Sequence, residues 1–421
     1  MRIAPLSTLA ALQFTCLVLV GLSQPAAARQ DSAGEVAFLP GTRDAPVWFE
    51  NVTLEDGLNQ SNVFDIEQDR KGFMWFATQV GLNRFDGTEI VRYLPDPFDS
   101  TSVHDAVVWD IEEDADGFLW LAHVDGTIAR FDPGTGRFRN YAASETDSIL
   151  TAIGGSFDLA IGPDGNVWAG GFGVLRLDAE TGEIRRWGTR ADNGGDVGWI
   201  ESILAESSGT FIVTGENAVY RFDPGEGTFT ALYETNSMGK RPVHDPHDPD
   251  VIWHGSYTEG VFRYNTRTAE VRTYDVTTGP GGASFSVVPD PMDPGIVWAA
   301  SFEGLVRLDK ESGGYHIYQG NPGGPEAGKL LGASIGPIHA DTGGLLWASA
   351  FGFGVSRFDP AAIGFERHGT DPRDPNGMRG QTVGAVLPMD DGVVWALALG
   401  TSPGHAGANW WLNRIDRRTG R

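Results

Sequence analysis

Cysteine is almost absent from this chain, which has one, Cys16, among 421 residues. It lies within the apolar stretch 6–22 and lacks the small residues that normally precede a lipidated cysteine. Without that stretch the chain has no disulfide, no thiol nucleophile and no cysteine-ligated metal. The fold must therefore depend on its own core, for which the 41% of hydrophobic residues supply the material.

Basic residues are also scarce. The chain has 31 Lys and Arg against 56 Asp and Glu, which gives a formal net charge of −25. No basic stripe interleaves with aromatic residues. Because phosphate contacts dominate nucleic-acid affinity and require cations, nucleic acid is not an expected partner.

Long apolar runs are missing except at the N-terminus. Residues 6–22 follow a segment with one Arg and precede an Ala-rich stretch with an Ala-x-Ala pattern before Arg29. A basic start, an apolar core and small residues are typical of a cleaved signal peptide, here over 1–28. We therefore expect a periplasmic or secreted protein; an uncleaved membrane anchor is the alternative.

Helical periodicity is absent over any ten residues, which excludes a helical solenoid. One pattern recurs instead: a turn, a short apolar segment with a Trp, a glycine, and a second apolar segment that ends in Asp. Its copies, at intervals of 41 to 49 residues, are centred on Trp75, Trp120, Trp168, Ile212, Trp253, Trp298, Trp347 and Trp395. Such a period indicates an array of one supersecondary unit.

Each copy contains four short apolar segments separated by turns. In the second copy they cover residues 107–114, 117–124, 127–133 and 137–143. Strands of this length with glycine-containing turns predict an antiparallel meander, and four strands per repeat predict an all-β fold, a β-propeller of four-stranded blades. The Trp lies in the second strand, where we expect it to fill the wedge between neighbouring blades.

The repeats resemble the two-component regulator propeller family, the periplasmic sensor region of bacterial membrane receptors. The shared pattern is Asp, Gly, Trp, Gly-Leu and aromatic-Asp. It is carried by Asp69, Gly72, Trp75, Thr78, Gly81, Leu82, Phe85 and Asp86, then by Asp114, Gly117, Trp120, Gly126, Phe131 and Asp132, and later by Gly344, Trp347, Gly354, Phe358 and Asp359. The resemblance covers about residues 47–421 and is looser at 245–253 and 290–298, where Asp-Pro-x-Asp-Pro replaces the turn.

The resemblance implies a sensor that carries no enzyme activity in this chain and needs no cofactor. Relatives usually have two rings, an immunoglobulin-like domain, a membrane span and a cytoplasmic histidine kinase or nucleotide cyclase. We expect this chain to be an N-terminal fragment of such a receptor, in which a homodimer can form. A free-standing exported propeller is the alternative.

Two ways of closing the ring compete. Residues 47–53 form a strand that can complete a seventh blade, which makes 47–364 a seven-bladed propeller. Residues 365–421 are then an incomplete eighth repeat that begins a second ring with a strand at 365–369. Alternatively, the early strand completes copy eight in an eight-bladed ring. The resemblance favours seven blades.

One face of the ring has longer connections, and function usually resides in such loops. Aromatic residues and a histidine there are candidates for binding a small molecule, an oligosaccharide or a partner domain. They are His104, Trp199, Tyr257, Phe302, Phe351, Phe353, Trp410 and Trp411. For each of them, packing within its own loop is the competing interpretation.

Other chemistry has weaker support. The stretch 244–250 has two His and three Asp, and 112–117 has the carboxylates of a calcium loop without its remaining ligands, so no metal is expected. Asp65, Asp110, Asp158 and Glu201 lie on predicted inner strands and can face the centre. A propeller lyase or glycoside hydrolase would need two such carboxylates to converge. That function and a protein-interaction scaffold remain the alternatives.

Overall fold

The computed structural model describes residues 47–104, 106–141, 158–188, 197–276, 284–321, 323, 326, 328–362, 382–389, 393–401 and 408–416. The predicted signal peptide at 1–28 and the strand expected at 365–369 lie outside these residues. The chain divides into two compact units, one of residues 1–41 and 49–360 and the other of residues 42–48 and 361–421.

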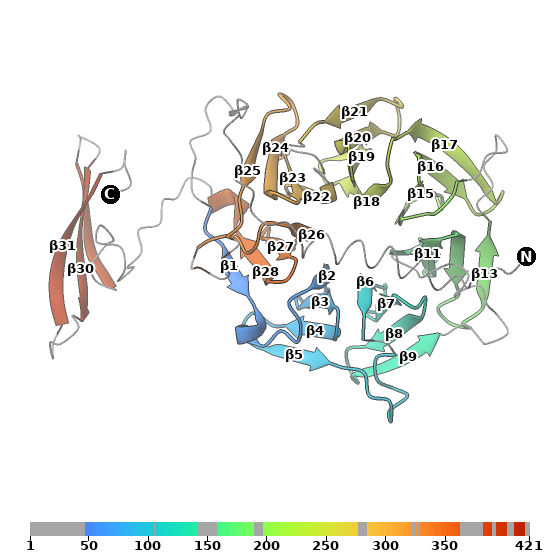
Figure 1. Ribbon diagram of the computed structural model, residues 1–421, viewed down its shortest axis with the longest axis horizontal. Coiled ribbons are helices and arrows are strands. Elements are labelled where there is room, and N and C mark those ends of the chain that lie inside the picture. The colour runs from blue at the N-terminus through green and yellow to red at the C-terminus, as the bar shows by residue number, and fades with distance from the viewer. Residues whose placement is uncertain are drawn as a thin grey trace, which may run out of the picture. The chain divides into compact units, whose positions relative to one another are not determined.

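The described residues of the larger unit form seven four-stranded antiparallel sheets arranged as a ring, which we number as blades 1 to 7 (Figure 1). Blade 1 contains β2 (Val63–Gln68), β3 (Met74–Thr78), β4 (Gly81–Phe85) and β5 (Ile90–Tyr93). Blade 2 contains β6 (Val108–Glu113), β7 (Leu119–His123), β8 (Ile128–Asp132) and β9 (Arg137–Tyr141). Blade 3 contains β10 (Leu159–Ile161), β11 (Val167–Gly171), β12 (Gly173–Leu177) and β13 (Ile184–Trp187).

The remaining blades repeat this order. Blade 4 contains β14 (Ser202–Ala205), β15 (Phe211–Thr214), β16 (Ala218–Asp223) and β17 (Thr228–Glu234). Blade 5 contains β18 (Gly239–Asp245), β19 (Asp248–Ser256), β20 (Gly260–Asn265) and β21 (Val271–Tyr274). Blade 6 contains β22 (Ser284–Pro289), β23 (Ile296–Ser301), β24 (Gly304–Asp309) and β25 (Tyr315–Tyr318). Blade 7 contains β26 (Ile335–Ala340), β27 (Leu346–Ala350), β28 (Gly354–Phe358) and the distant β1 (Glu50–Val52).

The pairing of β1 with β28 closes the ring. Val52 lies opposite Val355 and Glu50 opposite Arg357, so the first strand of the ring completes its last blade. A short 3₁₀ helix, η1 (Leu54–Asp56), follows β1, and η2 (Pro360–Ala362) follows β28. The predicted all-β propeller is confirmed, with the closure expected for seven blades.

A glycine begins the third strand at the closure because the outer strand comes very close. Gly354 has a φ of +118°, and a Cβ built on it would lie 2.4 Å from the carbonyl oxygen of Val52. The same geometry recurs at Gly81, where a Cβ would lie 2.3 Å from the oxygen of Tyr93. Both the left-handed backbone and the missing side chain are therefore required.

The repeated Trp residues of the ring fill the wedges between blades, as predicted, whereas Trp395 lies in the smaller unit and its wedge role stays a prediction. Trp120 of blade 2 is fully buried and packs with Leu159, Val167 and Leu177 of blade 3. Trp347 of blade 7 packs in the same way onto blade 1. Each wedge thus joins the second strand of one blade to the next blade, which makes the core continuous around the ring.

In the ring, an aspartate at the turn before the second strand accepts a hydrogen bond from the Trp of each of the six blades that have one. The indole N–H of Trp75 donates to Asp69 at 2.9 Å, and that of Trp120 donates to Asp114 at 2.8 Å. In blade 5, the Asp-Pro turn keeps this bond, from Trp253 to Asp245 at 2.8 Å. The changed turn chemistry of this copy therefore preserves the same buried hydrogen bond.

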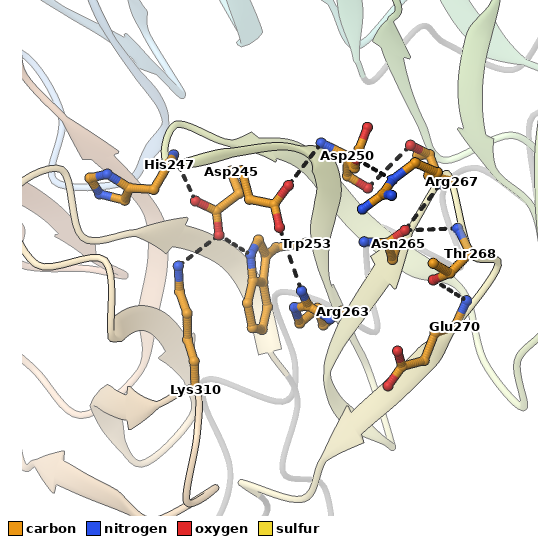
Figure 2. A network of polar contacts seen from close by, with 12 residues as sticks. Asp245, His247, Asp250, Trp253, Arg263, Asn265, Arg267, Thr268, Glu270 and Lys310 are labelled. Carbon is orange, nitrogen blue, oxygen red and sulfur yellow. Dashed lines mark hydrogen bonds and ion pairs between the residues drawn. The ribbon is translucent and has the colours of Figure 1, made fainter.

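The carboxylate of Asp245 accepts hydrogen bonds from several groups besides the Trp indole (Figure 2). It also accepts from the His247 amide at 2.9 Å and from the Lys310 ammonium of blade 6 at 2.6 Å. Burial alone would raise the pKa of Asp245, but the bonds from Lys310, His247 and Trp253 hold it below its ordinary value. This carboxylate therefore ties blade 5 to blade 6.

In blade 4, where Ile212 replaces Trp, other side chains bind the acidic residue at the turn and fill the wedge. Glu206 stands at the turn and accepts from the Arg221 guanidinium at 2.8 and 3.0 Å. The wedge beside Ile212 is filled by Tyr233, whose hydroxyl lies 2.7 Å from Nε2 of the buried His254. Burial lowers the pKa of His254 to about 4, so its ring is neutral at physiological pH.

The smaller unit contains a three-stranded antiparallel sheet among its described residues. Its strands are β29 (Thr382–Pro388), β30 (Val393–Thr401) and β31 (Ala408–Asp416). Trp395 lies opposite Arg414, the same pairing as Trp75 with Arg84 in blade 1. This sheet has the register of a blade, and its assignment as an eighth repeat over 365–421 stays a prediction.

We expect Gly354→Ala to lower the free energy of unfolding by about 2 kcal/mol or more, because Ala adds both strain at positive φ and a clash with Val52. The matched control is Gly352→Ala, which has a φ of +82° and no atom within 4 Å of the added Cβ. Denaturant unfolding monitored by Trp fluorescence measures both variants. If both variants lost the same free energy of unfolding, the clash with Val52 would contribute nothing to the effect of Gly354→Ala.

Candidate functional site

Carboxylates on the innermost strands link neighbouring blades at the centre of the ring. Asp65 on β2 accepts from the Ile111 amide of β6 at 3.0 Å. Asp110 on β6 accepts from the Leu159 amide of β10 at 2.8 Å. Asp158, which precedes β10, accepts from the Ile203 amide of β14 at 2.8 Å. Each of these buried carboxylates therefore has a structural partner in the following blade.

A single arginine crosses the centre of the ring to meet these carboxylates. Arg241 lies on β18 of blade 5, and its guanidinium contacts Asp65 of blade 1 and Asp110 of blade 2, the latter at 3.1 Å. It also donates to the Phe64 carbonyl at 3.2 Å. Its φ of +39° is unusual for a residue other than glycine. The contacts of its side chain reach Asp110 and Asp65, which lie 131 and 176 residues away in the sequence.

The charge on Arg241 is secured by its surroundings. Burial alone would lower the pKa of Arg241, but the carboxylates of Asp65, Asp110 and Asp158 raise it above its ordinary value. The guanidinium is thus charged at every relevant pH. It offsets part of a larger negative charge at the centre.

Two glutamates, Glu67 and Glu112, add carboxyl groups to the centre beyond those that Arg241 contacts. Burial, with Asp158 and Asp65 nearby, raises the pKa of Glu112 to about 8. Burial likewise raises the pKa of Asp158 to about 7, with Arg241 opposing the shift. Burial and the carboxylate of Glu112 raise the pKa of Glu67 well above its ordinary value. The centre therefore retains protons near neutral pH.

A second cluster lies beside Arg241, at the ends of the inner strands of blades 4 and 5. The Trp199 indole donates to Glu201 at 3.1 Å, and the Lys240 ammonium pairs with the other oxygen of Glu201. The same ammonium lies 4.4 Å from the centre of the Tyr257 ring. Phe172 packs edge-on against Trp199, with ring centres 4.9 Å apart. We call Trp199, Glu201, Lys240 and Tyr257 the central cluster.

The titration of the central cluster is shifted as well. Burial and the adjacent Arg241 lower the pKa of Lys240 to about 7, with Asp158 opposing the shift. Burial raises the pKa of Tyr257 to about 12. The Lys240 and Glu201 side chains remain 12% and 15% exposed, so solvent reaches the ion pair.

The structure brings together two of the eight predicted binding residues, Trp199 and Tyr257. His104 lies 3.3 Å from Asp125 within blade 2, and Phe302 is 37% exposed at the β23–β24 turn. Phe351 and Phe353 are partly buried in the β27–β28 turn. Trp410 and Trp411 lie on β31 of the smaller unit, where Trp410 is 60% exposed. Their roles in binding stay predictions.

The sequence reasoning missed both central cations. Lys240 and Arg241 are adjacent on an inner strand, where the first two copies have Phe-Asp and Trp-Asp at the corresponding place. Two adjacent basic residues on a predicted innermost strand, in a chain this acidic, could have indicated these central cations. It also missed the stack of Phe64 on Trp109, whose ring centres lie 4.5 Å apart.

The His and Asp residues of the stretch 244–250 make contacts within the ring. In the stretch 244–250, Asp245 already holds Trp253 and Lys310, and His247 contacts the Asp290 carbonyl at 2.9 Å. Across the residues that the structure describes, His, Cys, Asp and Glu form no group of three suited to a metal ion.

The fold defines the class of protein, a seven-bladed β-propeller. Solved structures with a similar fold include extracellular domains of two-component systems. One solved example is the extracellular domain described as hybrid two component system BT3049 from B. thetaiotaomicron, with a TM-score of 0.66 and 19% identity over 88% of this chain. The corresponding domain of BT4673 has a TM-score of 0.60 and 17% identity over 87% of this chain. At these identities the likeness shows the fold alone. This chain spans 49% and 47% of those two structures.

The family resemblance is confirmed at the sequence level. The model of the two component regulator propeller family matches residues 57–79, which include β2 and β3. A 55-residue stretch is 51% identical to Histidine kinase P4 of Formosa agariphila and covers 13% of this chain and 4% of that protein. The kinase activity in that name belongs to the longer protein. In this chain, no helix among the described residues has the length and apolarity to cross a bilayer.

We expect Arg241→Met to lower the free energy of unfolding by about 3 kcal/mol at pH 8, because it leaves Asp65, Asp110 and Asp158 without their cation. At pH 5 the loss should shrink, since Asp110 and Asp158, whose pKa values are raised by burial, then take up protons. Arg92→Met, at an exposed position on β5, is the control. Denaturant unfolding at both pH values measures the effect, and a loss independent of pH would contradict it.

Glu112 should make the protein less stable as pH rises. Its folded-state pKa of about 8 lies above its ordinary value of 4.5, so its contribution is full below 4.5 and disappears as pH rises through 8. Glu112→Gln keeps the neutral form and should reduce the loss between pH 5 and 8 by about 2 kcal/mol. Denaturant unfolding across this pH range measures the effect, with the exposed Glu226→Gln as the control. If both variants kept the pH dependence of the unmodified chain, Glu112 would not be its source.

Proposed function

We propose that this chain is an exported, non-catalytic sensory propeller that binds its ligand at the central cluster. The observation that carries the proposal is the Lys240–Glu201 ion pair enclosed by Trp199 and Tyr257. Charged and aromatic groups from separate blades converge there while remaining reachable by solvent. A rigid ring that presents such groups is typical of a recognition site.

The type of ligand follows from the kinds of side chain present. Aromatic faces suit the apolar faces of sugar rings and other flat molecules, and the ion pair offers both hydrogen-bond donors and acceptors. A small molecule or an oligosaccharide is therefore our first choice, and a partner domain is the second. The net charge of −25 disfavours nucleic acid.

A signalling role is supported by the comparisons. The 51% identity to a histidine kinase over 55 residues and the match to the regulator propeller family support the ring as the input part of a longer receptor. We propose that this receptor carries its output domain elsewhere, acts as a homodimer and places the ring in the periplasm. Ligand-induced changes at the centre of the ring would then be passed to the output domain.

An enzymatic function receives less support from the geometry. The carboxylates that sequence reasoning placed at the centre do converge, but Asp65 and Asp110 both contact Arg241 and both accept backbone amides. A glycosidase acid and nucleophile need oxygens available to substrate. These two carboxylates are occupied with holding the ring together.

Thermal-shift screening of the purified chain against an oligosaccharide panel tests the proposal. A ligand should raise Tm by about 3 °C or more at saturating concentration. Trp199→Ala should abolish the shift, because the ring that contacts the ligand and supports Glu201 is gone. Phe98→Ala, at an aromatic residue 97% exposed in the β5–β6 connection, should leave it unchanged. A shift that survives Trp199→Ala would place binding elsewhere.

A further inference from the structure

The ammonium group of Lys240 occupies a site that the rest of the chain builds for a cation. Glu201 supplies the opposite charge, and Tyr257 supplies the face of an aromatic ring at 4.4 Å. The Trp199 indole binds the second oxygen of the same carboxylate at 3.1 Å and so orients it. A carboxylate next to an aromatic face is the arrangement by which proteins bind ammonium groups.

The electrostatic surroundings also favour a cation. Asp158 lies close enough to Lys240 to influence its titration, and Glu216 accepts the Trp199 amide at 3.4 Å. Asp65 and Asp110 are engaged by Arg241. An incoming anion would meet this surplus of carboxylates, whereas an incoming cation would reduce it.

Lys240 is a poorly matched occupant of this site. It stands directly before Arg241, whose like charge opposes its own, and its ammonium is largely withdrawn from water. Both effects disfavour the charged form and lower the pKa of Lys240. An ammonium group that arrives without a neighbouring guanidinium avoids the first of these costs.

We propose that the ligand of the central cluster carries a primary ammonium group next to a flat apolar face, as an amino sugar does, and that it replaces the Lys240 ammonium on Glu201 and Tyr257. This inference rests on the proposed function and narrows its ligand class. Trp199 stacks on the apolar face of the ligand. The displaced Lys240 pulls on the neighbouring Arg241, which links the site to blades 1 and 2.

Chemical rescue tests the cation site directly. Lys240→Ala leaves the Glu201 carboxylate without its counter-charge and should lower Tm. Butylammonium chloride at about 50 mM should restore at least half of that loss, because it binds only the folded state of the variant. Butan-1-ol and sodium chloride at equal concentration should not. Lys71→Ala, at an exposed turn lysine, should show neither the loss nor the rescue.

A second measurement uses the unmodified chain and does not depend on a folded variant. Calorimetric titration with glucosamine hydrochloride and with glucose, at matched ionic strength, compares two sugars that differ by one ammonium group. We expect glucosamine to bind at least tenfold more tightly. Tyr257→Leu should remove most of that difference, because it deletes the aromatic face under the ammonium.

The outcomes separate the two proposals. Rescue by butylammonium alone, together with a preference for glucosamine, supports the cation site. Equal rescue by butan-1-ol, or equal binding of glucose and glucosamine, overturns it while leaving a saccharide sensor in place. If an oligosaccharide shift is found and it survives Trp199→Ala, then the proposed function at this cluster fails as well.

Discussion

The backbone pairing of β1 with β28 is the constraint on which the rest of this protein depends. Three residues at the start of the ring supply the outer strand of the blade that ends it, more than 300 residues later. This contact turns a row of meanders, each with an exposed apolar face, into a ring in which every wedge has two sides. The wedge-filling Trp residues stabilise the fold only because a neighbouring blade covers them, and closure supplies that neighbour to blade 7.

Closure also creates the centre, where the chemistry of this chain differs most from blade to blade. In blades 1 to 3 an aspartate on or beside the inner strand accepts an amide of the next blade, and in blade 5 the strand instead projects Lys240 and Arg241. Part of the buried negative charge is thereby offset from across the ring. Buried charges are retained only where they are paired, so the arginine and the carboxylates are interdependent. Arg241 thereby links blade 5 to blades 1 and 2 beside the cluster at which we propose that a ligand binds.

The residues that match the family model and the residues of the central cluster lie in different blades. The matched family repeat at 57–79 contains the strand that carries Asp65 but none of the residues of the central cluster. The propeller scaffold is what this chain shares with the extracellular domains of hybrid two-component systems. The cluster of Trp199, Glu201, Lys240 and Tyr257 is carried by blades outside the matched repeat, so the family match does not include the site that we propose for ligand binding.

The sequence by itself determined the repeat, its four strands and the Trp that marks most copies, because these depend on local turn chemistry and on alternation that is visible within about 45 residues. It offered residues 47–53 as a closing strand for either of two rings, and the pairing with β28 decided between them. It also predicted Asp65, Asp110, Asp158 and Glu201 on inner strands, which holds for the first two, while Asp158 and Glu201 lie directly before β10 and β14. Only the tertiary structure decided that Arg241 meets two of these carboxylates and that Trp199 and Tyr257 flank one ion pair. Those contacts join residues up to 176 positions apart, and their geometry is set by the closure of the ring rather than by any local pattern.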